Sequence, residues 1–517
     1  MNLLPKSIYI VSLIVFFIIV LSPLLVMFAD AFISSDNLSK ALLLDMRQLA
    51  LLKNSLAIGG GTVFFSLLIG LPLAFLIAKT DLPLRRFFLF FSFLPIFIPA
   101  YITAISWEKL LGPSGINFPI KIYGLGGVIF ILGLSYFPFV TLLTLTGLHS
   151  LDAKLEEAAA LAYPRLKVLK DITLPLIFPY ICSGVIFTFI FSVSNYGVPD
   201  LLRVITYPVE IFIQFSAFYD FSRATLLALP LVAFTLLLVL LQRHFMDKKS
   251  YITISGYRRF LFQIQLGRYK IVAVTFSTLV LLFSVIIPLI MLLIGAGSIT
   301  SYTAAFKTAH RQIINSVVLA CISATLITIL SFPIGYLIQR AKKMTSIIAD
   351  SISVIPFAIP PAILGIGLIR LWNRPVTNII YKTFWVIIFA HIARFIAFSV
   401  RVISSNISQI HTNMEEAASL VCKNWGKRLF RVILPLTKPG LLYGWIICFA
   451  LSIGELETTL LVTPAGEATL PIRIYTLMHY GAHKLVFSLC VILILIIFLP
   501  LGIIFFASRK FKKQGAQ

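Results

Sequence analysis

Charged residues are scarce in this chain of 517 residues, where they make up only 12% of the sequence. A soluble domain has about a quarter of its residues charged, so this shortage excludes an ordinary soluble protein. Cysteine is also scarce: there are five, an odd number, and no two have Cys-x-x-Cys spacing. The sequence therefore indicates neither a disulfide framework nor a thiolate metal site, and we interpret the cysteines as small apolar residues.

Two further absences limit the possible functions. The phosphate-binding pattern Gly-x-x-x-x-Gly-Lys-Ser/Thr is missing, and the nearest string, Gly426-Lys427-Arg428, does not match it. Without that loop we do not expect the chain to bind ATP in this way. Acids, histidines and nucleophiles are not clustered at one depth of the apolar segments, so a membrane enzyme finds no support.

Apolar residues are abundant, at 59% of the chain. A transmembrane helix needs about 20 mostly apolar residues, and roughly twelve such stretches occur. The runs are continuous, whereas the strands of a membrane barrel alternate apolar and polar residues. The sequence therefore predicts an all-α polytopic membrane protein. We expect spans near 8–29, 54–78, 87–107, 125–148, 174–196, 223–242, 269–295, 313–338, 347–371, 383–404, 435–458 and 484–507.

The net charge of +24 follows a topological pattern. About 26 of the 43 lysines and arginines fall in alternate loops between the expected spans, which is the positive-inside distribution. This pattern predicts a multi-pass protein with both termini in the cytoplasm. The basic excess is thus a signal of topology and does not indicate nucleic-acid binding.

The chain repeats one pattern twice. Asn-Ser pairs begin at Asn54 and Asn315, an offset of 261 residues, and Pro72 and Pro333 share that offset. Six expected spans separate equivalent points, so the halves have the same orientation and a pseudo-two-fold axis runs along the membrane normal. We expect a path for a solute between the halves. The predicted domains are a first half at 1–243, a basic cytoplasmic linker at 244–268 and a second half at 269–517.

Paired prolines follow at the same offset: Pro95 and Pro99 in one half, Pro356 and Pro360 in the other. Proline removes a backbone hydrogen bond, so we expect both helices to bend there. An ordinary kink and a role in gating both remain open.

Two polar loops, at 156–175 and 415–435, carry the main functional signal. Each begins Glu-Glu-Ala-Ala, has a basic middle and ends Leu-Pro, which suits a short amphipathic helix with an acidic N-terminus. Such a helix either lies in the lipid interface or docks a soluble partner that comes as a pair. The candidate residues are Glu156, Glu157, Ala158, Ala159, Leu174 and Pro175, and Glu415, Glu416, Ala417, Ala418, Cys422, Leu434 and Pro435.

These loops resemble the EAA motif of binding-protein-dependent ABC importer permeases: Glu-Ala-Ala, three residues, Gly, nine residues, Ile, one residue, Leu-Pro. In the second loop Glu416, Val432 and Leu434-Pro435 fall at that spacing, with Cys422 in place of the glycine. The first loop is one residue short.

The resemblance implies the type I importer fold, with two tandem six-helix halves in a bacterial inner membrane. It implies that each EAA helix is a coupling helix seated on an ATPase subunit. Two copies of that subunit would use ATP and Mg, and this chain would hold no cofactor of its own. A periplasmic solute-binding protein would supply the substrate.

A finer resemblance is to fused double-length permeases of the ferric-iron type, carried by the stretches 194–202, 252–269 and 455–482. It implies ferric iron as the substrate. Fused thiamine permeases are also similar, so thiamine or another small solute is the alternative. A more distant alternative is a secondary transporter of the major-facilitator type, which also has twelve spans in two parallel halves.

Charged residues occur within the expected spans, where they are costly and usually face the interior or water. Arg394 lies near the middle of one span and Glu455 near the end of the next, so both are candidates for the translocation path or its gate. We expect Arg394 to pair with a carboxylate or to meet an anion. His479 and His483 are four residues apart with Gly481 between them, and we do not expect them to bind a metal.

Overall fold

The structure is a computed structural model that describes residues 6–33, 46–113, 122–247, 264–422 and 424–514. Within these residues the chain is helical throughout, apart from turns and one isolated β-bridge between Thr80 and Ile264. The predicted all-α fold is therefore confirmed. Most of the expected linker, 248–263, lies outside the described residues.

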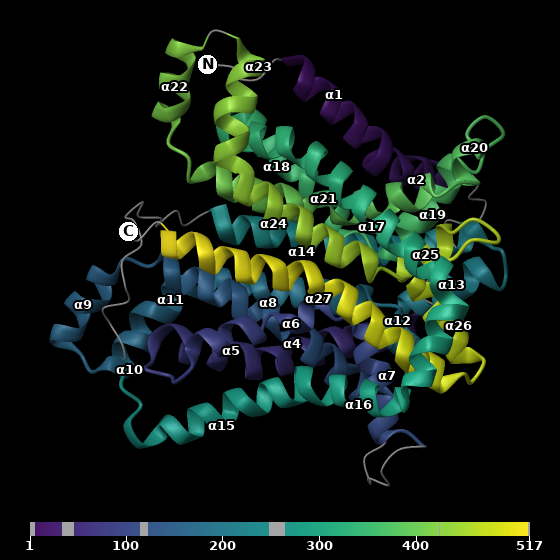
Figure 1. The fold of residues 1–517 in the computed structure, drawn as a ribbon, viewed down its shortest axis with the longest axis horizontal. Coiled ribbons are helices and arrows are strands. Elements are labelled where there is room, and N and C mark those ends of the chain that lie inside the picture. Colours follow the sequence, from purple (N-terminus) through teal and green to yellow (C-terminus); the bar gives the residue numbers. More distant parts are fainter. Residues whose placement is uncertain (1–5, 34–45, 114–121, 248–263, 423, 515–517) are drawn as a thin grey trace. The chain divides into compact units, whose positions relative to one another are not determined.

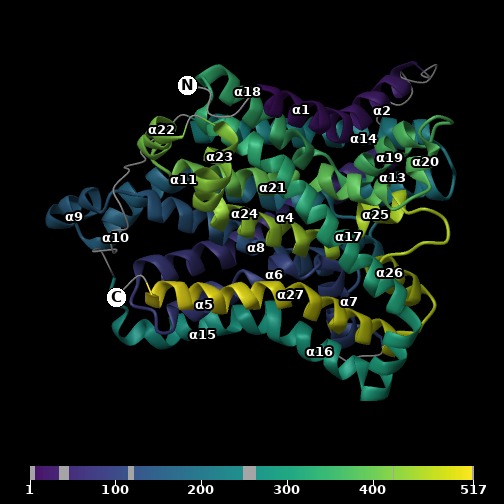
Figure 2. The same ribbon diagram turned by 45° about the horizontal axis from the view of Figure 1, so that its top comes forward.

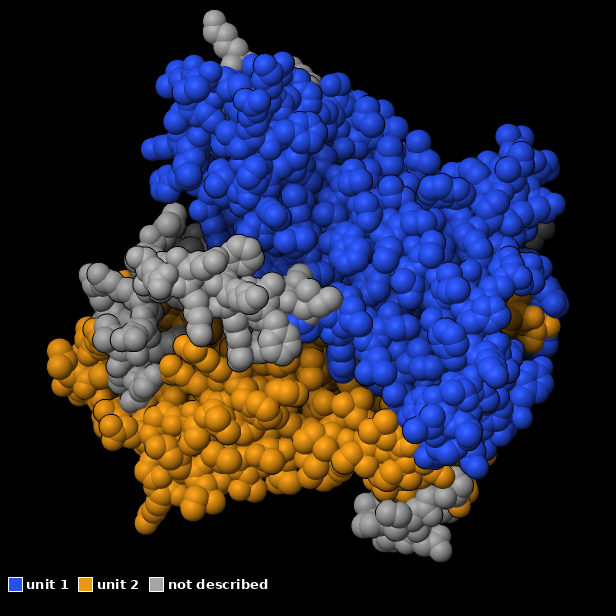
Figure 3. Space-filling view, in the orientation of Figure 1, with its two compact units in different colours: residues 1–41, 218–226, 296–517 blue, residues 42–217, 227–295 orange. Residues whose placement is uncertain are grey.

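The chain forms two compact units, coloured separately in Figure 3. One unit comprises 1–41, 218–226 and 296–517, and the other comprises 42–217 and 227–295. The first helices of the two halves are exchanged between them: α1 and α2 pack on α17 and α19 of the second half, while α15 packs on α4 and α5 of the first. The predicted domain boundaries at 243 and 269 follow the sequence repeat, and the two packing units do not follow these boundaries. The predicted domains therefore stay a prediction.

The helices of the unit formed mainly by the first half are α4 (Met46–Lys79), α5 (Arg85–Phe91), α6 (Leu94–Phe97), α7 (Ala100–Leu111), α8 (Leu125–Ser150), α9 (Ala153–Ala162), α10 (Arg165–Val168), η2 (Leu169–Thr173), α11 (Leu174–Ser194), α12 (Gly197–Leu201) and α13 (Tyr207–Ser216). Next come α14 (Phe221–Asp247), whose first residues belong to the other unit, η3 (Gly267–Tyr269), α15 (Lys270–Leu281), η4 (Leu282–Ile286) and α16 (Ile287–Ala296).

The helices of the unit formed mainly by the second half are α1 (Lys6–Phe16), η1 (Phe17–Leu21), α2 (Ser22–Ile33), α17 (Ile299–Arg340), α18 (Lys343–Val354), η5 (Ile355–Ala358), α19 (Pro361–Trp372), α20 (Asn378–Tyr381), α21 (Trp385–Ser408), α22 (Thr412–Val421), α23 (Trp425–Arg428), η6 (Leu429–Ile433), α24 (Leu434–Ile453), α25 (Glu457–Val462), α26 (Leu470–His479) and α27 (His483–Gln514).

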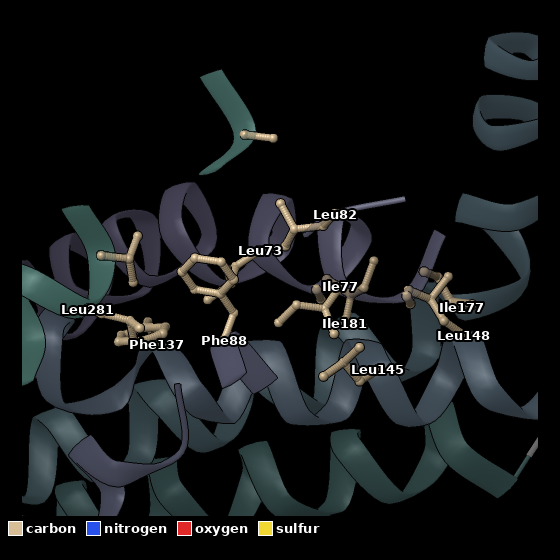
Figure 4. Close-up of a cluster of buried hydrophobic side chains, with 14 residues drawn as sticks. Leu73, Ile77, Leu82, Phe88, Phe137, Leu145, Leu148, Ile177, Ile181 and Leu281 are labelled. Atoms are coloured by element: carbon tan, nitrogen blue, oxygen red, sulfur yellow. The ribbon is translucent and has the colours of Figure 1, made fainter. Parts of the chain in front are cut away.

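Each unit is built around three packed helices. These are α4, α8 and α11 in one unit and α17, α21 and α24 in the other. Figure 4 shows the apolar cluster of the first trio, with side chains such as Leu73, Phe137 and Ile181 meeting from all three helices. A Cβ on Gly70 would lie 2.8 Å from the Phe137 carbonyl oxygen, so the small residue permits the close approach of α4 and α8.

Ten helices among the described residues are long and apolar enough to cross a membrane, fewer than the twelve expected. The span expected at 87–107 is instead two pieces, Arg85–Phe97 and Ala100–Leu111, bent by 97°. The span expected at 347–371 is likewise interrupted before α19, which has only 12 residues.

Proline explains both breaks. Pro99 and Pro360 are extended, with ψ of 131° and 140°, and stand immediately before α7 and α19. The preceding Ile98 and Ile359 are extended as well, because a following proline disfavours helical backbone. The predicted bends are confirmed, and they occur at equivalent positions of the two halves.

Candidate functional site: two polar loops and a buried charge cluster

The two polar loops form matching structures. Each has a ten-residue helix, α9 or α22, followed by a single helical turn and a short π-helix that runs directly into α11 or α24. In both loops the Leu-Pro pair begins this next long helix, with proline in its first turn. Helices α9 and α22 project beyond the ends of the long helices of their own unit (Figure 1, Figure 2).

The first glutamate of the first loop faces inward. Glu156 is buried and forms an ion pair with Lys79, the last residue of α4. The Thr173 hydroxyl donates a hydrogen bond to the same carboxylate at 2.7 Å. Both members of the pair are almost fully removed from solvent, so each depends on the other for compensation of its charge. Glu157, the next residue, is only half-buried.

The second loop repeats this division. Glu415 is buried and accepts hydrogen bonds from Arg340 Nη2 at 2.9 Å and from the Tyr336 hydroxyl at 2.6 Å. Arg340 is the last residue of α17 and also donates to the Ile410 carbonyl at 2.7 Å. Glu416 is exposed. In each loop, therefore, the first glutamate anchors the short helix and the second is the more accessible of the two.

The glycine position of the motif does not need a glycine here. Cys422 stands at this position with φ of −128°, which any residue can adopt, and its Sγ contacts the Asn424 carbonyl. The Asn424 side chain then accepts from the backbone of Gly426 and caps the turn that follows. In the first loop neither Ala162 nor Tyr163 has positive φ. The replacement of glycine thus leaves the local turn unstrained.

Exposed apolar side chains lie near the second glutamate of each loop. Leu161 and Leu166 protrude from the first loop, and Leu420 and Val421 from the second. Ala158 and Ala417 are exposed, while Ala159 and Ala418 are half-buried. Each loop thus presents a mixed apolar and acidic surface, which is the composition of a protein interface and not of a fully solvated helix.

The second candidate site is a charge cluster around α21. Arg394 pairs with Glu455 through Nη1 and with Glu457 through Nη2, the latter at 2.7 Å. The Glu455 side chain also accepts from the backbone N–H of Thr458 at 2.7 Å and of Thr459 at 2.8 Å, so it caps α25. The expected pairing of Arg394 with a carboxylate is confirmed. Its side chain is 21% exposed, against 1% for Glu455.

Three histidines were considered as possible ligands or neighbours of the charge cluster. His391 is buried one turn before Arg394 on α21, and its Nδ1 lies 3.0 Å from the Ser323 hydroxyl. His479 and His483 fall on different helices, because α26 ends at His479 and Gly481, with φ of +76°, turns the chain before α27. Among the described residues no group of three or more His, Cys, Asp or Glu side chains could hold a metal ion.

Lys79 and Arg340 are among the basic residues of the alternate loops, and the sequence did not identify a partner for either. They share the 261-residue offset of the repeat and end the two long helices. Their equivalent positions in the repeat were the one sequence signal that these two cations have a shared role. It did not identify Glu156 and Glu415 as partners, because the ion pairs join residues 77 and 75 positions apart.

Ten of the described helices are long and apolar enough to cross a membrane, and this is the construction of an integral membrane protein. The family described as binding-protein-dependent transport system inner membrane component matches this chain twice, at residues 66–251 and 331–513. The chain belongs to that family: it is a fused, double-length permease of the multi-pass inner-membrane class. Membership implies in general that it works with a solute-binding protein and an ABC ATPase.

Curated relatives extend over most of the chain. It is 25% identical to the Fe(3+)-transport system permease protein FbpB 2 of Haemophilus influenzae, over 84% of this chain and 86% of the relative. It is 23% identical to the ferric transport system permease protein FbpB of Actinobacillus pleuropneumoniae, over 86% and 69%. The putative 2-aminoethylphosphonate transport system permease protein PhnV of Salmonella typhimurium is 30% identical over only 25% of this chain.

Proposed function

We propose that this chain is the permease of an ATP-driven importer in which α9 and α22 each dock one copy of an ATPase subunit. The observation that carries the proposal is the repeated presence of a more accessible second glutamate, half-buried Glu157 or exposed Glu416, beside exposed apolar side chains, on helices held in place by a buried first glutamate. ATP and Mg would be used in those subunits, since this chain has no phosphate-binding loop and would hold no cofactor.

We propose ferric iron, delivered by a periplasmic binding protein, as the substrate. Relatives whose names specify ferric transport align with 84% and 86% of this chain, whereas the phosphonate-named relative aligns with a quarter of it. Thiamine or another small solute is the alternative. The family assignment removes the secondary-transporter interpretation.

We further propose that Arg394 and Glu455 line or gate the path. The cluster contains two carboxylates and one guanidinium, so its net charge is negative when all three groups are ionised. A negative site at membrane depth favours a cation. An unpaired Arg394 would repel Fe³⁺, whereas the two carboxylates beside it more than offset its positive charge.

The positive-inside distribution supports a topology in which both termini and both polar loops lie in the cytoplasm. The same orientation of the two loops is what a paired ATPase requires. Labelling of single cysteines introduced at the exposed Leu161 and Leu420 from either side of the membrane tests this topology. Labelling from the periplasm would contradict it.

The docking proposal is tested with Glu157→Lys and Glu416→Lys in one chain, expressed with its ATPase and binding protein. Uptake of radiolabelled iron should fall to background while the permease remains inserted, because positive side chains replace the second glutamate of each proposed docking helix. The single change at Glu416 should be the worse, since the second loop fits the motif spacing better. Asp220→Lys, at an exposed acid outside the loops, is the matched control.

Normal uptake by a well-inserted double variant would overturn the docking role. Substrate identity is measured in the same cells: thiamine uptake without iron uptake would replace iron by thiamine and leave the importer architecture intact. Unchanged uptake after deletion of the binding protein would contradict dependence on that partner.

A further inference from the structure

Helices α4 and α17 are each fastened at two widely spaced points, and the fastenings repeat between the halves. At one end Lys79 and Arg340 hold α9 and α22 through the buried glutamates. Removing one member of such a pair leaves the other charge buried without a partner. Each short helix therefore has an attachment to a long helix in addition to its chain connections.

The second fastening of each long helix, nearer its N-terminus, holds a different pair of helices. Ser55 of α4 accepts a hydrogen bond from the backbone N–H of Tyr207 at 3.1 Å, and Ser316 of α17 accepts from that of Leu470 at 2.7 Å. Tyr207 and Leu470 are the first residues of α13 and α26. The first N–H groups of a helix have no acceptor within it, so a serine of the long helix serves as the acceptor.

Charged and amide side chains strengthen the same connections. Arg47 of α4 pairs with Glu210 of α13 at 2.9 Å, and Arg311 of α17 pairs with Glu467, just before α26, at 2.6 Å. Asn54 donates to the Ile205 carbonyl at 3.0 Å. Several polar contacts thus join each long helix to one particular neighbour at this end.

The two fastenings on each long helix are equally spaced. Ser55 and Lys79 are 24 residues apart, and so are Ser316 and Arg340. At 1.5 Å per residue this separation is about 36 Å, which exceeds the roughly 30 Å of a bilayer's hydrocarbon core. The two attachment points of each helix therefore lie at opposite faces of the membrane.

A continuous α-helix resists a change in length, because every turn is closed by hydrogen bonds. Pro72 and Pro333 interrupt this pattern seven residues before Lys79 and Arg340, and they permit bending without extension. A displacement of α13 or α26 must then reappear at α9 or α22, unless one of the fastenings breaks.

We propose that α4 and α17 act as connecting rods that link α13 and α26 on one membrane face to α9 and α22 on the other. Lys79 and Arg340 are the positioning residues at the loop end, and Ser55 and Ser316 are those at the far end. The inference rests on the proposed function, in which α9 and α22 dock the ATPase. It assigns the route by which arrival of the binding protein reaches that ATPase.

The test uses the full complex in proteoliposomes, with the ATPase and an iron-loaded binding protein. ATP hydrolysis is measured with and without the binding protein, together with iron uptake. For Lys79→Met with Arg340→Met, which releases α9 and α22 from the long helices, stimulation by the binding protein should fall at least about fivefold, the lower range of typical coupling between sites. Retention of the ATPase is measured alongside, because the same change loosens the docking helices. Ser55→Ala with Ser316→Ala leaves both loops anchored, so it should keep the ATPase bound and basal hydrolysis unchanged while stimulation falls.

Three further variants test whether the effect depends on the connections made by α4 and α17. Arg85→Met with Lys342→Met changes exposed cations near the same helix ends and should leave stimulation unchanged. Reversing the pair, with Lys79→Glu and Glu156→Lys, should recover stimulation lost in Lys79→Met. Ser55→Ala with Ser316→Ala removes no charge, yet should also reduce stimulation from the far end, and it decides the question if the methionine variant does not insert.

If the binding protein stimulated ATP hydrolysis of the serine double variant as strongly as that of the wild type, the proposed role of α4 and α17 as connecting rods would be wrong. Equal losses in the methionine variant and its exposed-cation control would contradict that role as well. A wild-type complex that shows neither stimulation nor uptake would instead overturn the proposed function, so the two failures are distinguishable.

Discussion

The turn after α11 in one half and the turn after α24 in the other have the same construction but different charge. Asn195 accepts a hydrogen bond from the Val198 N–H at 3.0 Å and donates to the Tyr136 hydroxyl at 3.2 Å. Glu455, 260 positions later, accepts from Thr458 and pairs with Arg394. In both halves a buried side chain caps a short helix and takes a partner from the neighbouring long helix, α8 or α21.

The comparison shows that the turn needs a capping oxygen but does not need a charged side chain. Capping requires an acceptor oxygen, and the neutral Asn195 supplies one. The ion cluster of the second half is therefore more than the fold demands, and it carries the desolvation cost of buried charge. A role beyond capping for Arg394 and Glu455 is the simplest reason for this excess, which is why we place the candidate path beside them.

The strongest test transplants the neutral set into the second half, as Arg394→Tyr, Glu455→Asn and Glu457→Gln. Because a buried ion pair can often be replaced by neutral residues at little cost, unfolding stability should change by no more than about 1–2 kcal/mol. Iron uptake should fall to background. Denaturant unfolding of the purified protein and uptake in cells measure the two quantities, and retained uptake would show that the charges serve structure alone.

A larger loss of stability than in the transplant is expected when only one partner is removed. Arg394→Met leaves the buried Glu455 beside the half-buried Glu457 without their shared cation, and should cost about 3–5 kcal/mol of unfolding free energy. Thermal unfolding in detergent checks this value. In the first half the corresponding change, Tyr136→Phe, removes one neutral hydrogen bond and should cost about 1 kcal/mol. Equal costs in the two halves would contradict the distinction.

A smaller effect is expected from the neutral cap itself. Asn195→Ala removes the acceptor for Val198 N–H and should cost about 1 kcal/mol, the usual value for loss of an N-terminal cap. Uptake should be retained once expression is matched, because no charge is changed. Loss of uptake in a well-folded variant would give the first half a functional turn as well.

The smallest effect concerns the residues after α4 and α17, where Asp81 and Lys342 are equivalent by the 261-residue offset. A hydrogen bond from Lys270 lowers the pKa of Asp81, with a further contribution from the Leu266 N–H. A lowered folded-state pKa stabilises the protein above the unfolded pKa, near 3.9, and this contribution is lost as pH falls through the folded value.

Wild-type protein should therefore lose a little more stability than Asp81→Asn between pH 7 and about pH 3. Unfolding curves at the two pH values give the difference. Lys342→Asn, at the equivalent position of the other half, should show no such acid dependence. A difference between wild type and Asp81→Asn that appears only above pH 5 would contradict the assignment.

Much of the architecture was predictable, because apolar run length, repeated offsets and proline act locally along the chain. These signals predicted the helical class, the short helices α9 and α22, and the bends beside Pro99 and Pro360. They did not predict that Glu156 is buried while Glu157 is not. Adjacent residues of one type can be told apart only by their tertiary partners, and here the partner, Lys79, is 77 positions away.

The number of unbroken spans was overestimated for a related reason. Proline predicted a bend in the span expected at 87–107, but hydropathy, which sums over a window, did not show that the bend reaches 97° and divides the span into separate helices. The cap formed by Glu455 was also unpredictable, since sequence reasoning treated its charge as a feature of the path and not as an acceptor for backbone N–H groups.

Because α1 and α2 pack on helices of the second half, they can complete their packing only after the second half has been synthesised. Helix α2 packs on α19, and Gly367 leaves so little room that a Cβ there would lie 2.8 Å from the Pro23 carbonyl oxygen. Gly367 is synthesised 344 residues after Pro23, a delay of roughly 20 to 70 s at normal rates of translation. The first span of the nascent chain must therefore wait in the bilayer for its partner. Fusion of two halves into one polypeptide keeps that waiting segment tethered to the surface it will eventually cover.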